Sequence, residues 1–192
     1  TLETGQTYVY DWKYTEASNM WTVVAGGGMR KESLSIIEDP NSSESKSVKI
    51  IKDADDNIVY KRIKTQMEYD FGLRQTSLVV DPEGIAKTAE YDYYTDKSQT
   101  GKYGRKKSIQ NADGSWTTYD YDSQGRISLK VTAYKDSPFN SPPGQAKATY
   151  YSYTSHDPED VPLGNDSRPR TIETKLLGTG VTKTYFVYKK NA

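Results

Sequence analysis

The sequence contains no cysteine, and no apolar run approaches the length of a membrane-spanning helix. Without cysteine the chain has no disulfide, no thiolate nucleophile and no cysteine-based zinc site, and the redox compartment stays undetermined. A helix that crosses a bilayer needs about 20 apolar residues, so we expect no membrane insertion. No charged and then apolar signal segment stands at the N-terminus. Because the chain starts at Thr1 and not at a Met, we expect it to be an excised or processed piece.

An excess of charge of either sign is also missing, because Lys plus Arg and Asp plus Glu both number 26. No net field would therefore draw the chain to phosphate backbones or to anionic lipid. We expect neither nucleic acid nor a membrane surface as a partner.

Hydrophobic residues are scarce at 34%, whereas tyrosine occurs 17 times. Aromatic rings with a polar tip suit half-exposed sheet faces better than a dry core. Disordered chains are poor in aromatic and β-branched residues. The composition therefore favours a folded chain.

Apolar and polar residues alternate with a period of two along several segments, which is the pattern of half-buried β-strands. No segment of a dozen residues keeps the three-and-four spacing of an amphipathic helix. The residues expected on one face of a strand are Tyr8, Tyr10, Trp12 and Tyr14 in the first segment, Ile63, Thr65, Met67 and Tyr69 in another, and Ile127, Leu129 and Val131 in a third.

Short clusters of Asp, Asn and Gly separate these segments and predict hairpin turns, because Gly supplies positive φ and Asx side chains bond their own backbone. The clusters are residues 53–57, 81–84, 111–114, 122–125 and 178–180. We therefore predict an all-β fold built from antiparallel hairpins. Two proline-bearing stretches, residues 137–144 and 155–164, are expected to form loops at the sheet margin.

Turns and aromatic segments recur along the chain. Gly84, Gly114 and Gly144 are about 30 residues apart, a period typical of repeat architectures, and an aromatic segment follows each of them. The run Ala25-Gly26-Gly27-Gly28 indicates a boundary. We predict an N-terminal aromatic strand segment at residues 1–28 and β-hairpin repeats at residues 29–192, with one continuous domain as the alternative.

Residues 114–127 resemble the YD repeat of the RHS family, whose pattern is Gly, four residues, Tyr-x-Tyr-Asp, two residues, Gly-Arg and a branched aliphatic residue. The positions that match are Gly114, Tyr119, Tyr121, Asp122, Gly125, Arg126 and Ile127. Degenerate copies lie at Tyr69-Asp70, Tyr91-Asp92, Tyr103-Gly104-Arg105 and Tyr185. The resemblance covers residues 46–190 and leaves out the N-terminal segment.

The resemblance implies antiparallel hairpins that coil into a curved or spiral sheet, which in long members forms a shell around a toxin or adhesive cargo. It implies a secreted or cell-surface protein of bacterial type, whose partners are adjacent repeats of the parent protein and a protein or glycan cargo. The predicted function is a non-catalytic structural repeat module.

In such a module we expect Tyr119 and Tyr121 to share one face of the sheet. Asp122 opens the turn that Gly125 closes, and Arg126 lies across a ring or pairs with a carboxylate. All of these residues would stabilise the fold and perform no chemistry.

Candidate chemical sites are incomplete. Asp53, Asp55 and Asn57 match the start of a calcium loop, but Ile58 and Lys64 stand where glycine and a bidentate glutamate are needed. His156 is the only histidine and has no nucleophile context. We therefore predict that the chain is not an enzyme and holds no cofactor or metal.

Aromatic rings and an open strand edge give two further expectations. Trp12, Trp21 and Trp116 could form flat platforms for sugar rings, which would make the chain a carbohydrate-binding β module; cross-strand packing of the same rings is the competing interpretation. The last candidate strand, residues 182–190, is expected to present an unpaired edge that supports self-association.

Overall fold

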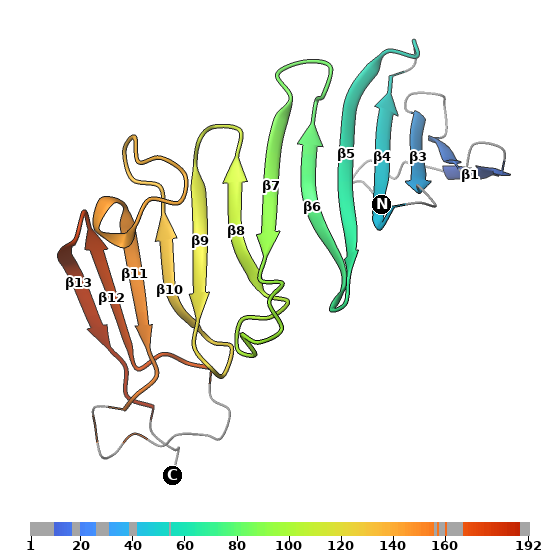
Figure 1. Ribbon diagram of the computed structural model, residues 1–192. Helices are drawn as coiled ribbons and strands as arrows, with labels where there is room; N and C mark the ends of the chain where they lie inside the picture. Colours follow the sequence, from blue (N-terminus) through green and yellow to red (C-terminus); the bar gives the residue numbers. More distant parts are fainter. Residues whose placement is uncertain are drawn as a thin grey trace. The chain divides into compact units, whose positions relative to one another are not determined.

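The computed structural model describes residues 10–16, 20–25, 31–38, 42–53, 55–155, 157, 160 and 167–188 (Figure 1). Within these ranges the regular structure consists of β-strands and a few short turns of 3₁₀ helix, of which η2 (Pro143–Gln145) is one. All of the strand pairs are antiparallel, and neighbours in the sheet are neighbours in sequence. The predictions of an all-β fold and of antiparallel hairpins are confirmed.

The chain divides into two compact units, Thr1–Glu90 and Tyr91–Ala192, and the division falls within β7 (Lys87–Tyr93). The boundary predicted at residues 26–28 lies outside the described residues. The strands of the first unit, each paired with the next, are β1 (Tyr10–Thr15), β2 (Met20–Ala25), β3 (Lys31–Glu38), β4 (Glu44–Lys52), β5 (Ile58–Tyr69) and β6 (Gly72–Val80).

The second unit is a series of three hairpins. Its strands are β8 (Lys106–Asn111) and β9 (Trp116–Tyr121), β10 (Ile127–Thr132) and β11 (Lys147–Ser152), and β12 (Thr171–Leu176) and β13 (Thr179–Tyr185). Strands of consecutive hairpins also pair, β9 with β10 and β11 with β12. The tips of the three hairpins are residues 112–115, 133–146 and 177–178.

The predicted turns at residues 53–57, 81–84, 111–114 and 122–125 connect strands as expected. The position predicted for the last turn, residues 178–180, is wrong. The turn is formed by Leu177 and Gly178, whose φ values are 50° and 82°. A two-residue hairpin turn of this type needs positive φ at both central residues. Thr179 therefore already starts β13, and the strand expected at residues 182–190 ends at Tyr185.

A small core lies on one face of the second unit. Trp116, Val131, Ala146 and Ala148 are buried there, with Leu129, Ala133 and Tyr150 packed around them. The loop at residues 133–146 reaches this cluster: Trp116 Nε1 donates to the Ser137 carbonyl over 3.0 Å, and the Phe139 ring meets the indole edge-on at 6.2 Å. The proline-bearing stretch at residues 137–144 is thus a loop, as predicted, and it covers the core.

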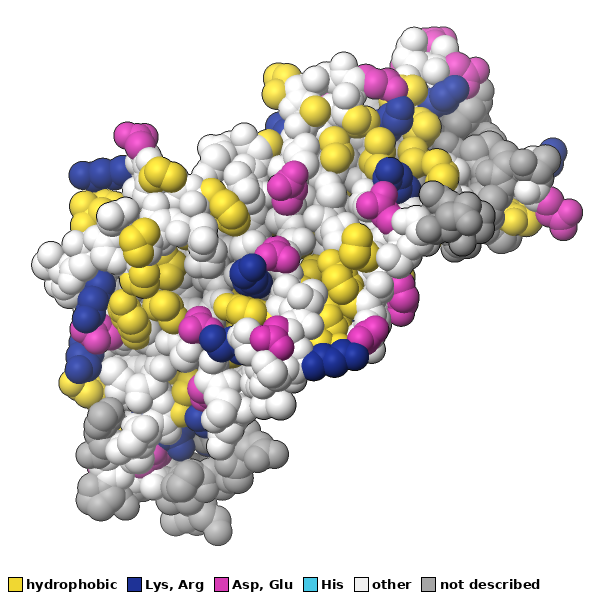
Figure 2. All heavy atoms as spheres, viewed as in Figure 1, with side chains coloured by type: hydrophobic (Ala, Val, Ile, Leu, Met, Phe, Trp, Pro, Cys, Tyr) yellow, Lys and Arg dark blue, Asp and Glu magenta, His cyan; other side chains and the backbone are white. Residues whose placement is uncertain are grey.

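Charged side chains of both signs are interspersed with hydrophobic ones over the visible surface of each unit (Figure 2). In the described residues no helix is long and apolar enough to cross a membrane.

Candidate functional site

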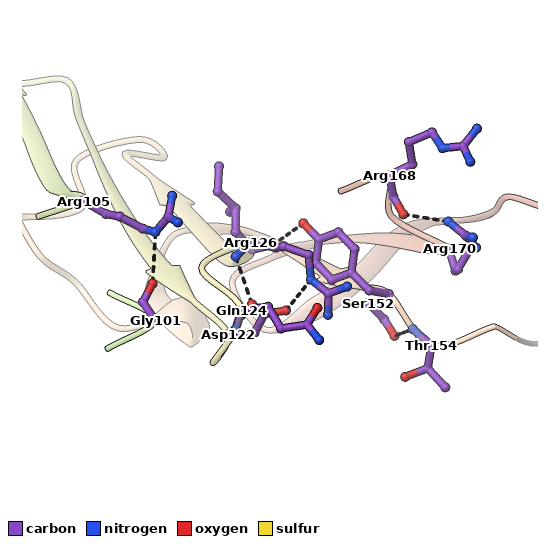
Figure 3. Close-up of polar contacts among 11 residues, drawn as sticks. Gly101, Arg105, Asp122, Gln124, Arg126, Ser152, Thr154, Arg168 and Arg170 are labelled. Carbon is purple, nitrogen blue, oxygen red and sulfur yellow. Dashed lines mark hydrogen bonds and ion pairs between the residues drawn. The ribbon is translucent and has the colours of Figure 1, made fainter. Parts of the chain in front are cut away.

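The best-defined constellation of side chains in the second unit starts at the turn between β9 and β10. The Asp122 carboxylate accepts hydrogen bonds from the backbone N–H groups of Gln124 and Arg126, at 3.0 and 2.9 Å, and the Asp122 carbonyl accepts from Gly125 N over 2.9 Å. Arg126 Nε also donates to Asp122 Oδ2 at 2.7 Å (Figure 3). Burial of Asp122 would raise the pKa of its carboxyl, but the bonds and charge of Arg126 outweigh burial and lower the pKa.

Gly125 closes this turn with a φ of 78°. A side chain at this position would be strained by this φ, and its β-carbon would displace the guanidinium of Arg105. Arg105 is held there by a 3.0 Å bond from its Nε to the Gly101 carbonyl (Figure 3). The turn thus opens at Asp122 and closes at Gly125.

The same arrangement of an arginine and a tyrosine recurs at the open end of each hairpin. The arginine directly precedes the first strand and lies over the ring of a tyrosine at or just beyond the end of the second strand. The distances from guanidinium carbon to ring centroid are 5.5 Å for Arg105 and Tyr121, 4.0 Å for Arg126 and Tyr153, and 4.6 Å for Arg170 and Tyr188. We call these three pairs the arginine–tyrosine stacks.

Each tyrosine of a stack is also fixed by its hydroxyl, which donates to a backbone carbonyl next to the arginine of the same stack. The acceptors are Lys106 O for Tyr121 at 2.8 Å, Ile127 O for Tyr153 at 2.9 Å and Pro169 O for Tyr188 at 3.2 Å. In each of the three hairpins, the cation–ring contact and the hydroxyl bond thus connect the start of the first strand with the end of the second. Such contacts contribute about 0.5–2 kcal/mol for the cation and about 1 kcal/mol for the hydrogen bond.

Neighbouring groups extend the stacks. Tyr94 meets the Tyr121 ring edge-on at 6.1 Å, donates its hydroxyl to the Tyr119 carbonyl over 2.8 Å and lies under Lys102.

Burial raises the pKa of Tyr121 to about 12. This effect of burial outweighs that of the Arg105 charge, which lowers the pKa. The first stack therefore holds Tyr121 as a protonated, uncharged phenol.

The third stack uses a different carboxylate. Arg170 pairs with Asp160, the two side chains being 3% and 1% exposed, and Asp160 Oδ1 also accepts from Tyr188 N at 3.0 Å. Arg168 adds a second cation over the Tyr188 ring, at 4.1 Å. Asp160 thus forms an ion pair with Arg170, as Asp122 does with Arg126. Nothing in the local sequence around Asp160 predicts this, because the residue lies ten positions before its arginine.

The other predicted repeat residues also hold structural places. Gly114 has a φ of 80° in the tip of the first hairpin and faces open space. Tyr119 and Tyr121 occupy alternate positions of β9 and so share a face, as expected. Arg126 was expected either over a ring or on a carboxylate; it does both, and its ring is Tyr153 at the end of the same hairpin.

The expectation of an exposed platform is wrong for Trp116. This residue is 2% exposed in the core of the second unit, because the loop at residues 133–146 folds over it. The Trp12 side chain on β1 is 59% exposed, and the Tyr14 side chain on the same face is 43% exposed. The Trp21 side chain lies outside the part of the chain whose side chains are described.

A hollow of about 270 Å³ adjoins the core loop in the second unit. Asp92, Lys107 and Asp120 line it, together with the Phe139 ring and Pro142. Its charges are already paired, Asp92 with Lys107 at 3.0 Å and Asp120 with Lys102 at 2.5 Å. The hollow therefore offers no uncompensated charge to a ligand.

The candidate calcium loop is a closed hairpin turn. Asp53 Oδ1 accepts from the backbone N–H groups of Asp55 and Asn57 at 3.0 and 2.9 Å, and Oδ2 accepts from the Asn57 side chain at 3.1 Å. Among the described residues, no three His, Cys, Asp or Glu side chains gather as a metal site would need. His156 lies outside the described residues.

Comparisons with known proteins add no relative. No protein-family model matches the chain, and no curated protein matches it significantly.

Proposed function

We propose that this chain is a non-catalytic, structural repeat module of the YD type from a larger secreted or cell-surface protein, where it forms part of a shell or scaffold. The observation that carries this proposal is the threefold recurrence of the arginine–tyrosine stack at the open ends of successive hairpins. A repeat architecture predicts such recurrence, because each repeat is the same kind of hairpin and packs its side chains against the next repeat.

The location of the YD pattern supports the same interpretation. Its Tyr121 ends one hairpin, and its Gly125 and Arg126 lead into the next, so the pattern covers the joint between two hairpins. The residues that define the resemblance are therefore those that attach one hairpin to the next. The proposed partners are adjacent repeats and a protein or glycan cargo, and a curved sheet formed by many such joints is part of this proposal.

Double-mutant cycles across the three stacks test the repeat proposal. The arginine is changed to Gln and the tyrosine to Leu at Arg105 and Tyr121, at Arg126 and Tyr153, and at Arg170 and Tyr188, and free energies of unfolding are measured in urea. We expect a favourable coupling of about 0.5–2 kcal/mol in all three pairs.

Lys183 and Tyr185 provide the matched control, since the ammonium lies 5.4 Å from the ring centroid on a fully exposed strand. Coupling there should stay below about 0.5 kcal/mol. Coupling in only one stack, or an equal value for the control, would show that the recurrence has no energetic meaning and would remove the basis of the proposal.

A carbohydrate-binding module is the second candidate, and the exposure of the Trp12 and Tyr14 side chains favours it. Sugar faces stack on flat, exposed aromatic rings of this kind. A glycan array with the full chain would reveal such binding, which Trp12→Ala should abolish without loss of fold. Binding that survives this variant would exclude the proposed platform.

A further inference from the structure

The hollow of about 270 Å³ in the second unit lies on the face of the sheet that carries the core. The strand register places Ser108 opposite Thr118 and Thr118 opposite Val131, so the first two residues share a face with a buried core residue. Residues 139–143 of the covering loop line the hollow from the other side. The hollow is therefore the part of the core face that the loop borders and leaves open.

The side chain of Ser108 is buried there without a hydrogen-bond partner. Ser108 is 7% exposed and lines the hollow. Its hydroxyl has no hydrogen-bond partner among the described residues, which include every residue from 91 to 155. The hydroxyl oxygen is not fully enclosed by protein atoms, so a group in the hollow can reach it. A buried hydroxyl without a partner is unfavourable, and a hydrogen bond to a ligand would remove this cost.

Other polar groups of the lining are also able to bond a ligand. The Thr118 hydroxyl and the Asn140 side-chain amide have no hydrogen-bond partner in the described part of the chain. The carboxylates of Asp92 and Asp120 each accept from the backbone N–H of the next residue and from a lysine ammonium. A carboxylate has lone pairs for about four hydrogen bonds, so these two can accept further ones. The lining thus offers donors and acceptors, whereas its carboxylate charges are already balanced.

An aromatic side chain forms part of the same lining. Phe139 is 45% exposed and contributes to the hollow together with Pro142 and Leu129. Concave binding sites combine such apolar surfaces with a few convergent polar groups, which orient the ligand. The lining therefore suits a ligand that has both apolar C–H faces and polar edges.

We propose that this hollow binds a small, uncharged, polyhydroxylated ring of the size of one sugar residue. The paired charges disfavour an ion, and the unpartnered hydroxyls of Ser108 and Thr118 disfavour a purely apolar ligand. A ligand hydroxyl both donates and accepts, so neighbouring hydroxyls of one ring can bond a protein hydroxyl and a carboxylate together. The C–H face of the ring lies against Phe139. The site does not depend on the repeat proposal and uses other residues than the platform at Trp12.

Titration of the full chain with methyl glycosides tests the site by amide chemical shifts and by calorimetry. The probes are methyl α-glucopyranoside, methyl β-galactopyranoside and methyl α-mannopyranoside, with tetrahydropyran as the ring without hydroxyl groups. We expect saturable binding of at least one glycoside with a Kd of roughly 10 mM or tighter. Amide shifts should centre on Ser108, Thr118 and Asn140, and NaCl should leave the Kd unchanged because the ligand carries no charge. Tetrahydropyran should not saturate.

Variants then locate the binding on the sheet face. Ser108→Ala and Thr118→Val each remove one hydroxyl with little change in volume, and each should weaken binding about threefold to tenfold, as expected for one hydrogen bond. Thr117→Val is the matched control, because Thr117 precedes Thr118 on β9, faces the opposite side of the sheet and does not line the hollow. It should leave the affinity unchanged.

The free Ser108→Ala protein should melt no earlier than the parent, since the substitution removes a buried hydroxyl that has no partner. If that variant does not fold, Thr118→Val decides. The proposal is overturned if no glycoside saturates the protein by about 100 mM, if tetrahydropyran binds equally well, or if the variants in the hollow match Thr117→Val.

Trp12→Ala separates this site from the platform on the first unit. Binding in the hollow should survive that variant, and its loss would place the ligand at Trp12 and overturn the proposal. The double-mutant cycles across the arginine–tyrosine stacks are measured without ligand, so the repeat proposal and the hollow can fail independently.

Discussion

The two units are built from the same kind of antiparallel strand but differ in how they protect it. In the second unit Trp116, Val131, Ala146 and Ala148 are buried under a loop, and every hairpin is closed by an arginine–tyrosine stack. In the first unit no side chain that the structure describes is buried to this degree, and Ile36, Ile37, Ile58 and Val59 are all exposed. Strand pairing alone therefore does not produce a core in this chain; a covering loop does.

The first unit accordingly depends on cross-strand contacts in half-exposed positions, each of which contributes roughly 0.2–1 kcal/mol. A sheet needs a second layer to bury one of its faces. We therefore expect the first unit to be the less stable of the two, and the predictions below test that difference.

The largest effect is expected at the core tryptophan. Trp116→Ala removes an indole that is 2% exposed, with its hydrogen bond to Ser137 O, and should lower the free energy of unfolding of the second unit by about 3–5 kcal/mol. Urea titration followed by amide resonances of each unit measures it. Trp12→Ala in the first unit is the control, with a change within about 0.5 kcal/mol because the ring is 59% exposed. Equal losses would remove the contrast between the units.

The first stack should give the next largest effect. Tyr121→Ala removes a half-buried ring, its cation and its hydroxyl bond, and should cost about 2–3 kcal/mol. Gly125→Val should cost as much, because a β-branched residue resists a φ of 78° and would displace Arg105. Thermal unfolding of both variants checks this, and melting temperatures equal to that of the parent would contradict the role assigned to the stack.

Alkaline pH should weaken the second unit selectively. The folded-state pKa of Tyr121 is raised to about 12 from an ordinary value of 10.0, so its stabilising contribution is complete below pH 10 and is lost as the pH rises toward 12. Burial also raises the pKa values of Tyr94, Tyr119 and Tyr153 in the same unit.

Unfolding measured between pH 9 and 12 should therefore show a steeper loss for the second unit than for the first. Tyr121→Phe should flatten that slope, whereas Tyr185→Phe, at a ring 58% exposed, is the matched control. A slope that Tyr121→Phe leaves unaltered would contradict the assignment.

The smallest effect concerns the outermost strand of the second unit. Every residue of β13 is exposed, and in the described part of the chain β13 pairs only with β12. Unpaired backbone groups on such an edge favour association with another strand. We expect weak self-association across a two-fold axis in sedimentation experiments at increasing concentration. A strict monomer at about millimolar concentration, with slow amide exchange on the outer side of residues 179–185, would show that the edge is covered.

Much of the fold could be predicted from local sequence. The alternation of apolar and polar residues predicts the strands, and Asp122 with Gly125 predicts the turn, because these signals act over a few residues. Contacts between residues far apart in sequence could not be predicted in this way. Tyr153 is not recognisable as the partner of Arg126 until the strands are paired. Asp160 is not recognisable as the partner of Arg170, because ten positions separate the two residues.

Trp116 shows the same limit for burial. Its position in a strand predicts that it lies on a face, but which face is covered depends on a loop of later sequence. The apolar residue Phe139 among the prolines of that loop is the signal that could have indicated a cover, because solvent-exposed loops rarely need a large ring.

The separation of stack and tip has a consequence for how such hairpins vary in length. The stacks lie at one end of each hairpin, whereas the tips at the other end range from residues 177–178 to the long segment 133–146. Residues inserted at a tip leave the arginine and its tyrosine opposite each other, because the strand register next to the stack does not depend on the length of the tip. One hairpin can therefore gain a segment that shields a tryptophan while its neighbours keep a minimal turn. In these three hairpins the length varies at one end, and the other end keeps the two strands aligned.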